Sequence, residues 1–311
     1  MAKNAETIKY RIVERIARGA ESVLYRAQAV NDDREFCVKR IRNWVGRLFS
    51  PAGRRSDKEK LEVSYAGKVK HLKNEFAVAQ KLDQSGDIPV VRVFALRQIR
   101  PCFLEFGFDL LMEYIEGDDL GDRKAVRMLR LPDKIDCFYQ TALALQYMHQ
   151  TGIVHLDMKP SNIMVTDGKV KLIDFGMSIP IGQRPRSMAG TVGYLSPEQI
   201  VREEVDQGTD VFALGVTFSA VFGGRCLRQT HEELSDVQTK RQASFLLSSS
   251  DQPLITDVFE ARQVPELEAL IRRCTVPKRE ARIRDAKAVA TALQRIAKDL
   301  GIHLTEPTYP L

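Results

Sequence analysis

Cysteine is scarce in this sequence, and none of its usual pairings occurs. The 5 cysteines lie far apart, are odd in number and include no CxxC pair. Such a pattern suggests neither a disulfide framework nor a zinc site. A reducing compartment fits it best, and we therefore expect a cytoplasmic protein.

Long apolar runs are also missing. No stretch of the sequence approaches the roughly 18 consecutive apolar residues expected of a membrane-spanning helix. The first four residues, Met1-Ala2-Lys3-Asn4, do not begin the apolar core of a signal peptide. We expect a soluble protein without a membrane span, unless the chain is a piece of something longer.

A strong excess of one charge is the third absence. The 47 Lys and Arg residues against 41 Asp and Glu residues give a net charge of +6 over 311 residues. This mild excess favours ATP, acidic proteins or nucleic acid, but it is too small and too dispersed to indicate nucleic-acid binding. The 44% of hydrophobic residues is enough for a substantial core, so the chain folds as one large domain or two ordinary ones.

The chemistry is concentrated between residues 155 and 176. An acid (Asp157), a cation (Lys159) and an amide (Asn162) share one short loop, and a second acid (Asp174) follows a β-like run. Phosphoryl transfer needs a group that orients a hydroxyl, a cation for the migrating charge and oxygen ligands for Mg²⁺. This inventory therefore suits phosphoryl transfer.

The same residues carry a family resemblance. The run from His155 to Asn162, followed by Asp174-Phe175-Gly176, resembles the H-R-D-x-x-x-x-N and D-F-G motifs of eukaryotic-type Ser/Thr protein kinases. The resemblance implies that Asp157 is the catalytic base, that Lys159 steadies the transferring phosphoryl group, and that Asn162 with Asp174 holds Mg²⁺. It also implies a packing role for His155, although a histidine beside an acid would suit general-base work as well.

One position of the motif departs from the family. Leu156 stands where the family has an Arg that clamps a phosphorylated residue of the activation segment, and leucine has no hydrogen-bond donor. We predict activity that does not depend on phosphorylation of Ser178 or Ser187. The alternative is that Arg184 or Arg186 supplies a substitute clamp.

Strand-like alternation between residues 8 and 40 predicts antiparallel β structure at the start of the chain. Residues 16–25 lie between the first two strands and resemble the family's G-x-G-x-x-G-x-V phosphate loop with only the middle glycine kept. The resemblance implies nucleotide contacts at Gly19 and at three further positions, Ala17, Ser22 and Leu24. An ordinary hairpin turn at Gly19 is the alternative.

Lys39 ends the third strand and resembles the lysine that grips the α- and β-phosphates of ATP, with Cys37 in the position that packs over adenine. A basic stretch, residues 43–60, reads as a flexible insertion, more as a solvated loop than as a docking site. The amphipathic helix after it carries Glu75, which is our choice as the partner of Lys39. Glu62 remains the competitor.

Residues 111–120 resemble the hinge between kinase lobes, because an apolar strand ends there in glycine and acids. The resemblance makes Met112 the gatekeeper, gives Glu113 and Ile115 backbone hydrogen bonds to adenine, and lets Asp119 reach the ribose hydroxyls. From the residues alone this stretch is a strand and a turn.

Residues 190–198 resemble the close of a kinase activation segment, which is the family's platform for a peptide. Thr191 would hydrogen-bond Asp157 and Lys159 and shape the pocket beside the phosphoacceptor. Glu198 would anchor the segment through a buried salt bridge to an arginine later in the chain.

For that salt bridge we prefer Arg282 over Arg279, because the family's usual arginine position is altered here. Asp210 matches the acid that ties down the catalytic-loop backbone from a buried helix. The sequence pattern of residues 223–262 does not indicate a clear structure, because a polar run stands where the family has a helix.

We therefore predict an α+β, bilobal protein kinase fold forming a single kinase domain, residues 1–311. Its β-rich N-lobe spans about residues 8–115 and its mostly helical C-lobe about 116–298, followed by a short tail, 299–311. ATP and Mg²⁺ are the expected cofactors and proteins the expected substrates, with no nucleic-acid partner; the sequence does not indicate an oligomeric state. A nucleotide-binding pseudokinase scaffold is one alternative, and a small-molecule phosphotransferase is another.

Overall fold

The computed structural model divides into two compact units, residues 1–83 with 91–116, and residues 84–90 with 117–311. Within helices, the side chains of residues 55–63, 237–239 and 246–248 fall outside the description. The described residues are 8–19, 22–43, 55–83, 87–100, 106–186, 189–224, 226–227, 237–255 and 258–309.

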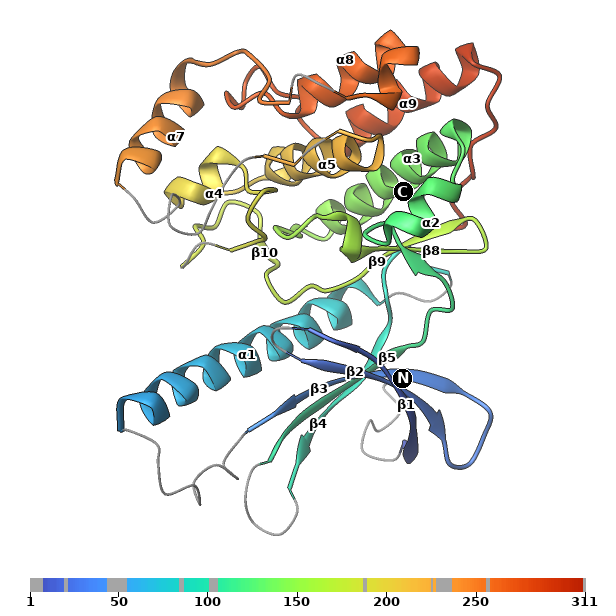
Figure 1. The fold of residues 1–311 in the computed structure, drawn as a ribbon, viewed down its shortest axis with the longest axis vertical. Helices are drawn as coiled ribbons and strands as arrows, with labels where there is room; N and C mark the ends of the chain where they lie inside the picture. The colour runs from blue at the N-terminus through green and yellow to red at the C-terminus, as the bar shows by residue number, and fades with distance from the viewer. Residues whose placement is uncertain are drawn as a thin grey trace. The chain divides into compact units, whose positions relative to one another are not determined.

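The first unit is built on a five-stranded sheet in which every neighbouring pair is antiparallel (Figure 1). Alternate apolar residues of its strands form one core cluster that includes Phe36, Val38 and Leu111. In spatial order the strands are β1 (Tyr10–Arg18), β2 (Val23–Ala29), β3 (Glu35–Arg42), β5 (Gly107–Glu113) and β4 (Val93–Ile99).

Helix α1 (Arg55–Leu82) packs against β4 and β5, and Figure 1 shows it lying along the sheet. Its buried apolar side chains include Leu72, Val78 and Leu82. The helix begins at Arg55, so the predicted flexible insertion is wrong over residues 55–60; residues 44–54 lie outside the described part of the chain. Lys, Glu and Arg dominate the first turns, and these are strong helix formers even where no apolar period marks a helix.

The second unit is mostly helical and is centred on two buried helices, α3 and α5. Phe138 of α3 and Phe218 of α5 stack with ring centroids 4.2 Å apart. Its helices are α2 (Arg123–Met128), α3 (Leu131–Gln150), α4 (Pro197–Val201), α5 (Gln207–Val221), α7 (Val237–Ser249), α8 (Pro265–Cys274) and α9 (Ala286–Asp299), with 3₁₀ turns η3 (Pro160–Asn162) and η4 (Glu260–Gln263). Short strands frame the loops: β6 (Asp118–Asp119), β7 (Ile153–Val154), β8 (Ile163–Thr166), β9 (Lys169–Leu172) and β10 (Ile179–Pro180).

Local signals set the limits of α3. Pro132 and Asp133 occupy its first turn, where proline needs no amide partner and an acid favours the positive end of the helix. The chain leaves the helix through Gly152, whose φ of +75° suits a residue without a side chain. The helix therefore ends at this glycine, directly before the strand that leads into the catalytic loop.

Helix α7 lies in the stretch, residues 223–262, for which the sequence pattern gave no clear structure. It packs against α4, and Ala243 joins Leu195 and Ile200 in a small apolar cluster. Most of its side chains are polar, so its sequence shows only a weak helical pattern of apolar residues. The helix therefore depends on this tertiary contact.

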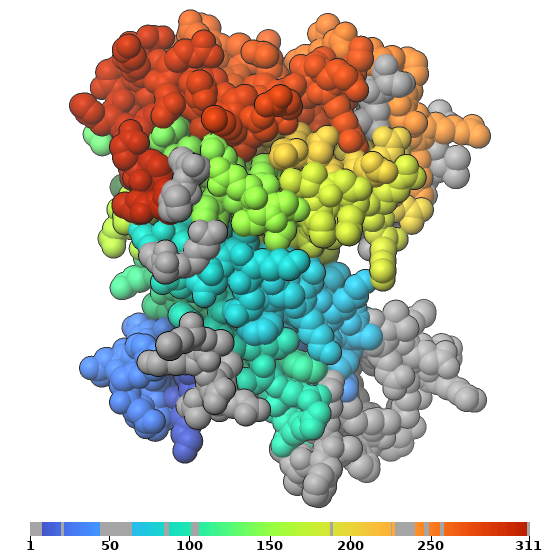
Figure 2. All heavy atoms as spheres, turned by 180° about the vertical axis from the view of Figure 1, so that it is seen from behind, coloured from blue at the N-terminus to red at the C-terminus, as the bar shows by residue number. Residues whose placement is uncertain are grey.

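The tail after α9 is held against the second unit. Thr305 donates from both its amide and its Oγ1 to the carboxylate of Asp136, and Thr308 Oγ1 donates to Asp87 Oδ2. In Figure 2, the red atoms of α9 and the tail run down one side of the second unit. Across the described residues, no helix is long and apolar enough to cross a membrane.

Replacing Phe138 by alanine tests this account of the core. The ring is fully buried, so Phe138→Ala should lower the free energy of unfolding by about 3–5 kcal/mol in denaturant titrations. The matched control is Phe245→Ala on the exposed side of α7, which should change it by no more than about 0.5 kcal/mol. Equal effects of the two changes would contradict the placement of α3 and α5 at the centre of the unit.

Candidate active site

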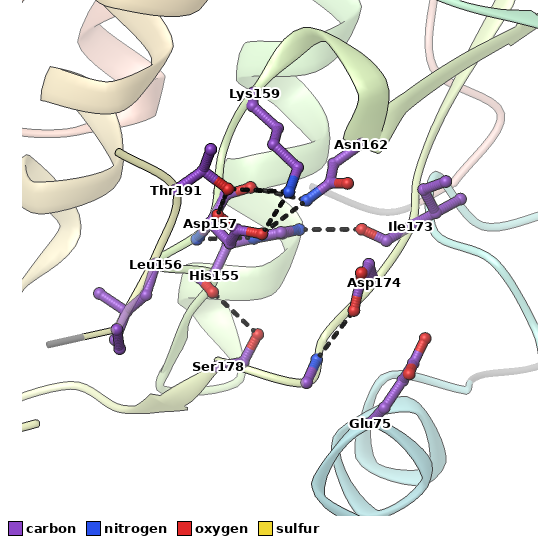
Figure 3. Close-up of polar contacts among 12 residues, drawn as sticks. Glu75, His155, Leu156, Asp157, Lys159, Asn162, Ile173, Asp174, Ser178 and Thr191 are labelled. Carbon is purple, nitrogen blue, oxygen red and sulfur yellow. Dashed lines mark hydrogen bonds and ion pairs between the residues drawn. The ribbon is translucent and has the colours of Figure 1, made fainter. Parts of the chain in front are cut away.

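The loop after β7 closes a ring of hydrogen bonds around Asp157 (Figure 3). Thr191 Oγ1 donates to Asp157 Oδ1 at 2.6 Å, and Lys159 Nζ donates to Asp157 Oδ2 at 2.9 Å and to Thr191 Oγ1 at 2.8 Å. Asn162 Nδ2 donates to the backbone oxygen of Asp157 at 2.7 Å. Each carboxylate oxygen of Asp157 is therefore oriented, and the sequence had predicted these partners for Thr191.

This ring leaves Asp157 able to act on a hydroxyl group. A carboxylate has about four lone-pair sites, so the bonds from Thr191 and Lys159, with a longer one of 3.3 Å from Asn162 Nδ2, leave room for another donor. The ammonium group of Lys159 lies within the same ring, where it can balance negative charge that develops beside the acid. The arrangement suits a step in which a hydroxyl is oriented while charge moves toward a lysine.

Asn162 and Asp174 offer oxygen atoms next to this ring. Since Asn162 uses Nδ2 toward Asp157, its side-chain oxygen is the end of the amide turned away from that residue. Asp174 has a φ of +66°, and the backbone amide of Ile173 before it donates to the backbone oxygen of Asn162 at 3.1 Å, which joins the two segments. An amide and a carboxylate are ligands that suit a hard divalent cation.

Within the described part of the chain, no larger metal cluster competes with this pair. Among the described residues, no group of three or more His, Cys, Asp or Glu side chains is arranged to hold a metal ion. Two protein ligands are few for a dedicated cage, but they suit a cation that also keeps waters and phosphate oxygens.

His155 has a structural role in this site, as we expected. Its Nδ1 accepts from the amide of Asp157 at 3.2 Å, and its Nε2 donates to the oxygen of Ile173 at 3.1 Å. The ring meets Phe175 edge-on with centroids 5.7 Å apart, and the side chain is fully buried. Because both ring nitrogens are engaged, His155 orients the loop and is not placed to take a substrate proton.

Asp210 of α5 holds the backbone of the catalytic loop. Its carboxylate accepts from the amides of His155 at 2.7 Å and Leu156 at 2.8 Å, and from His149 Nε2 at 2.8 Å. Burial would raise the pKa of Asp210, but the hydrogen bond and charge of His149 with the other donors outweigh it and lower that pKa. The anchoring by Asp210 was predicted, whereas His149 was not, because nothing in the sequence marks it.

Leu156 occupies a left-handed backbone conformation, with a φ of +66°, and its side chain is buried. It belongs to an apolar cluster with Val154, Ala189 and Val205, against which three residues of the activation segment pack: Met177, Ile179 and Ile181. The position that in the family carries a charged clamp thus holds the segment through apolar contacts here.

Gln199 is a residue that sequence reasoning missed. Its Nε2 donates at 2.8 Å to the backbone oxygens of both Leu156 and Ala189, which ties the catalytic loop to the end of the activation segment. The available signal was its position directly after Glu198 in the first turn of α4, where its Oε1 also accepts from the amide of Ser196.

Glu198 pairs with Arg282, the arginine that we preferred over Arg279. Arg282 Nη1 and Nη2 lie 2.6 Å and 3.1 Å from the two carboxylate oxygens of Glu198, and both side chains are buried. Arg282 also donates to three backbone oxygens, those of Val276, Gly208 and Pro277. Burial would raise the pKa of Glu198, but the charge and hydrogen bonds of Arg282 lower it.

In the first unit, Lys39 of β3 forms its salt bridge with Glu75 of α1. The Nζ to Oε2 distance is 2.8 Å, and Glu75 is only 2% exposed. The side chain of Glu62, the competing candidate, lies outside the described residues. Cys37 lies opposite Met112 in the β3–β5 ladder, and burial raises the pKa of the Cys37 thiol to about 11.

The candidate phosphate loop is the turn between β1 and β2. The amide of Gly19 donates to the oxygen of Ser22 at 2.9 Å, and Ala17 lies opposite Leu24 in the β1–β2 pairing. Residues 20 and 21 lie outside the described part. The hairpin geometry is therefore present, and a nucleotide contact at these four residues stays a prediction.

The predicted hinge residues follow β5. Met112 and Glu113 end that strand, and the amide of Glu113 donates to the oxygen of Arg92 at 2.8 Å, so Glu113 could offer adenine only its carbonyl. Ile115 is two residues further on and half-buried. Asp119, in β6 of the second unit, accepts from the amide of Gly121 at 2.8 Å, and burial raises its pKa.

Comparison with known proteins agrees with this inventory. The family model described as "Protein kinase domain" matches residues 10–293. The chain is 30% identical over 225 residues to the serine/threonine-protein kinase PknA of Corynebacterium glutamicum, covering 70% of this chain and 43% of that protein. It is 38% identical over 145 residues to the Aurora kinase of Saccharomyces cerevisiae, covering 44% of this chain and 38% of the relative. The chain thus spans less than half the length of these curated relatives.

The Glu198–Arg282 pair should govern stability against acid. Since the pKa of Glu198 is lowered on folding, its contribution is present above its ordinary value of 4.5 and is lost as the pH falls through the lower folded value. Glu198→Gln leaves Arg282 buried without a counter-charge, so the free energy of unfolding at pH 7 should fall by about 3–5 kcal/mol.

That variant should also lose less stability than the wild type as the pH falls below 4.5, because it has no carboxylate left to protonate there. Denaturant titrations at several pH values measure both effects. The control is Glu266→Gln at an exposed position of α8, which should stay within about 0.5 kcal/mol of the wild type. A change of similar size in both variants would refute the role given to the buried pair.

Proposed function

The chain belongs to the protein kinase family, and we propose that it transfers the γ-phosphoryl group of ATP to serine or threonine hydroxyls of proteins. The observation that carries this proposal is the ring formed by Asp157, Lys159 and Thr191. Lysine two residues after the catalytic acid resembles Ser/Thr kinases and not tyrosine kinases. The names of the relatives, PknA and Aurora kinase, support the same activity.

Each member of the ring has a distinct task. Asp157 orients the acceptor hydroxyl and takes its proton, which requires an oriented carboxylate oxygen of the kind that the bond from Thr191 provides. Lys159 lies beside the acid and balances the charge of the phosphoryl group as it moves. Thr191 holds both side chains in register and shapes the wall beside the acceptor. Catalysis rests on positioning and electrostatics.

Most of the residues that we assign to the nucleotide belong to the first unit. The buried carboxylate of Glu75, 2.8 Å from Lys39 Nζ, keeps that ammonium group in one place. Held in this way, Lys39 would bind the α- and β-phosphates. Residues Gly19, Ala17, Ser22 and Leu24 would line the phosphates, and Cys37, Met112, Glu113, Ile115 and Asp119 would contact adenosine.

Mg²⁺ is the divalent cation that we assign to this site. Asn162 and Asp174 would hold it, since an amide and a carboxylate oxygen with room for water and phosphate oxygens match its preferences. When bound, Mg²⁺ supplies charge neutralisation for the triphosphate. The protein's own part is to fix the two ligands, through the bonds of Asn162 to Asp157 and of Ile173 to Asn162.

The two alternatives are less well supported. A pseudokinase scaffold is suggested by the loss of glycines around Gly19 and by Leu156, but neither change removes a group that takes part in the reaction. A small-molecule phosphotransferase would not need the segment from Gly190 to Glu198, which in the family serves as a platform for a peptide.

We further propose that activity does not depend on a phosphorylated activation segment. Ser178 is 1% exposed and donates its Oγ to the oxygen of His155 at 3.2 Å, so a phosphate there would need the local packing to open. Leu156 packs against Met177, Ile179 and Ile181 and takes the place of a charged clamp. The exposed Arg184 lies 3.7 Å from Glu204, and Ser187 lies outside the described residues.

Asp157→Asn tests the enzymatic activity. Loss of the acid should lower phosphate transfer from radiolabelled ATP to a generic protein acceptor by about 10²–10⁴-fold, because an amide cannot take the proton. The matched control is Asp167→Asn, the same change at an exposed turn, which should leave the rate unaltered. If the wild type transfers no more phosphate than Asp157→Asn, the protein is not a kinase and the nucleotide-binding scaffold becomes the better account.

The double change of Ser178 and Ser187 to alanine tests the regulation. The variant should keep most of its activity, because apolar packing around Leu156 and not a phosphate holds the segment. The same transfer assay measures this, and circular dichroism checks that the variant is folded. A folded variant that has lost most of its activity would show that a phosphate is required.

A further inference from the structure

A groove in the second unit opens directly beside the catalytic ring. Its volume is about 1000 Å³, and Lys159 and Thr191 of the ring form part of its wall. Helix α2 and the segment after α5, with Gly223 and Gly224, form other walls. The proposed phosphoryl transfer uses Lys159 and Thr191 but not α2, Gly223 or Gly224, so these other walls can contact a stretch of another chain near the ring.

The charge of the groove is unevenly balanced. The charged side chains lining it are four cations and a single acid, Arg123, Arg127, Lys134, Lys159 and Glu260. Glu260 is bound by Lys134 at 2.5 Å, and Lys159 is bound by Asp157. Within the described residues, Arg123 and Arg127 have no ion pair, and both are exposed. The groove therefore presents two uncompensated guanidinium groups.

The sequence of α2 places both arginines on the groove side. Positions 123 and 127 are four residues apart, so they share one face of the helix, and Val126 lines the groove with them. Lys124 belongs to the same helix but does not line the groove. Guanidinium groups bind carboxylates through two parallel hydrogen bonds, which a lysine cannot do.

We propose that Arg123 and Arg127 select protein substrates that carry Asp or Glu close to the acceptor hydroxyl. This substrate class rests on the proposed kinase function, because the groove adjoins the residues that would position the acceptor. A basic segment would meet two free guanidinium groups and one carboxylate that Lys134 already occupies. An acidic segment satisfies both arginines, and the net charge of +6 draws such partners to the chain.

A matched peptide series tests the proposal. Three peptides share one threonine, flanked by glutamates, alanines or lysines, and kcat/KM is measured for the 311-residue chain with each. The wild type should favour the glutamate peptide over the alanine peptide by about tenfold, as expected for two partly exposed charge pairs. Arg123→Glu with Arg127→Glu should remove this preference and favour the lysine peptide, and Lys124→Glu on the same helix should retain it. Raising the salt concentration should weaken the preference.

Binding without turnover separates this proposal from the kinase function. Labelled versions of the three peptides with alanine in place of threonine are titrated by fluorescence anisotropy. If the wild type transfers phosphate to no peptide above the level of Asp157→Asn but binds the glutamate peptide most tightly, the kinase function fails and the preference of the basic groove for acidic segments stands. Equal binding of all peptides, tighter binding of the lysine peptide, or an unchanged preference in the double arginine variant would overturn the proposal.

Discussion

One buried carboxylate sets the geometry of the catalytic loop. Asp210 is fully buried in α5 and accepts from two successive amides, those of His155 and Leu156, while His149 donates to the same oxygen as His155. A leucine at a φ of +66° costs of order 1–3 kcal/mol, and it persists only where its surroundings hold it. The hydrogen bonds to Asp210 provide that hold, and the position of Asp157 follows from it.

From this anchor the loop organises its neighbours. The oxygen of Leu156 accepts from Gln199, which also holds Ala189 at the end of the activation segment. The oxygen of His155 accepts from Ser178 near the start of that segment. Both ends are thus bonded to the two residues that Asp210 fixes.

Much of this could be predicted from the sequence. The catalytic loop is recognisable because its residues are close together in the chain, and the choice of Glu75 for Lys39 followed from the spacing of a single helix. Helix α9 is defined locally, by a clear apolar period and the cap at Asp285. The preference for Arg282 over Arg279 agrees with the observed salt bridge.

What the sequence could not reveal depends on long-range contacts. His149 and Gln199 lie in ordinary helical positions, and only the fold places them opposite Asp210 and Leu156. Leucine at position 156 predicts the absence of a donor but not the cluster that receives its side chain. The early start of α1 and the existence of α7 were missed because neither stretch has a strong apolar period, so packing or intrinsic propensity decides them.

The most direct test of this account is amide hydrogen exchange at His155 and Leu156, measured by NMR. If Asp210 holds both amides, they should exchange about as slowly as the core amides of α5, since each hydrogen bond opens only when the buried carboxylate is exposed. Exchange at these two amides as fast as at the exposed turn residue Gly168 would show that the loop is not held by Asp210 and would contradict the account.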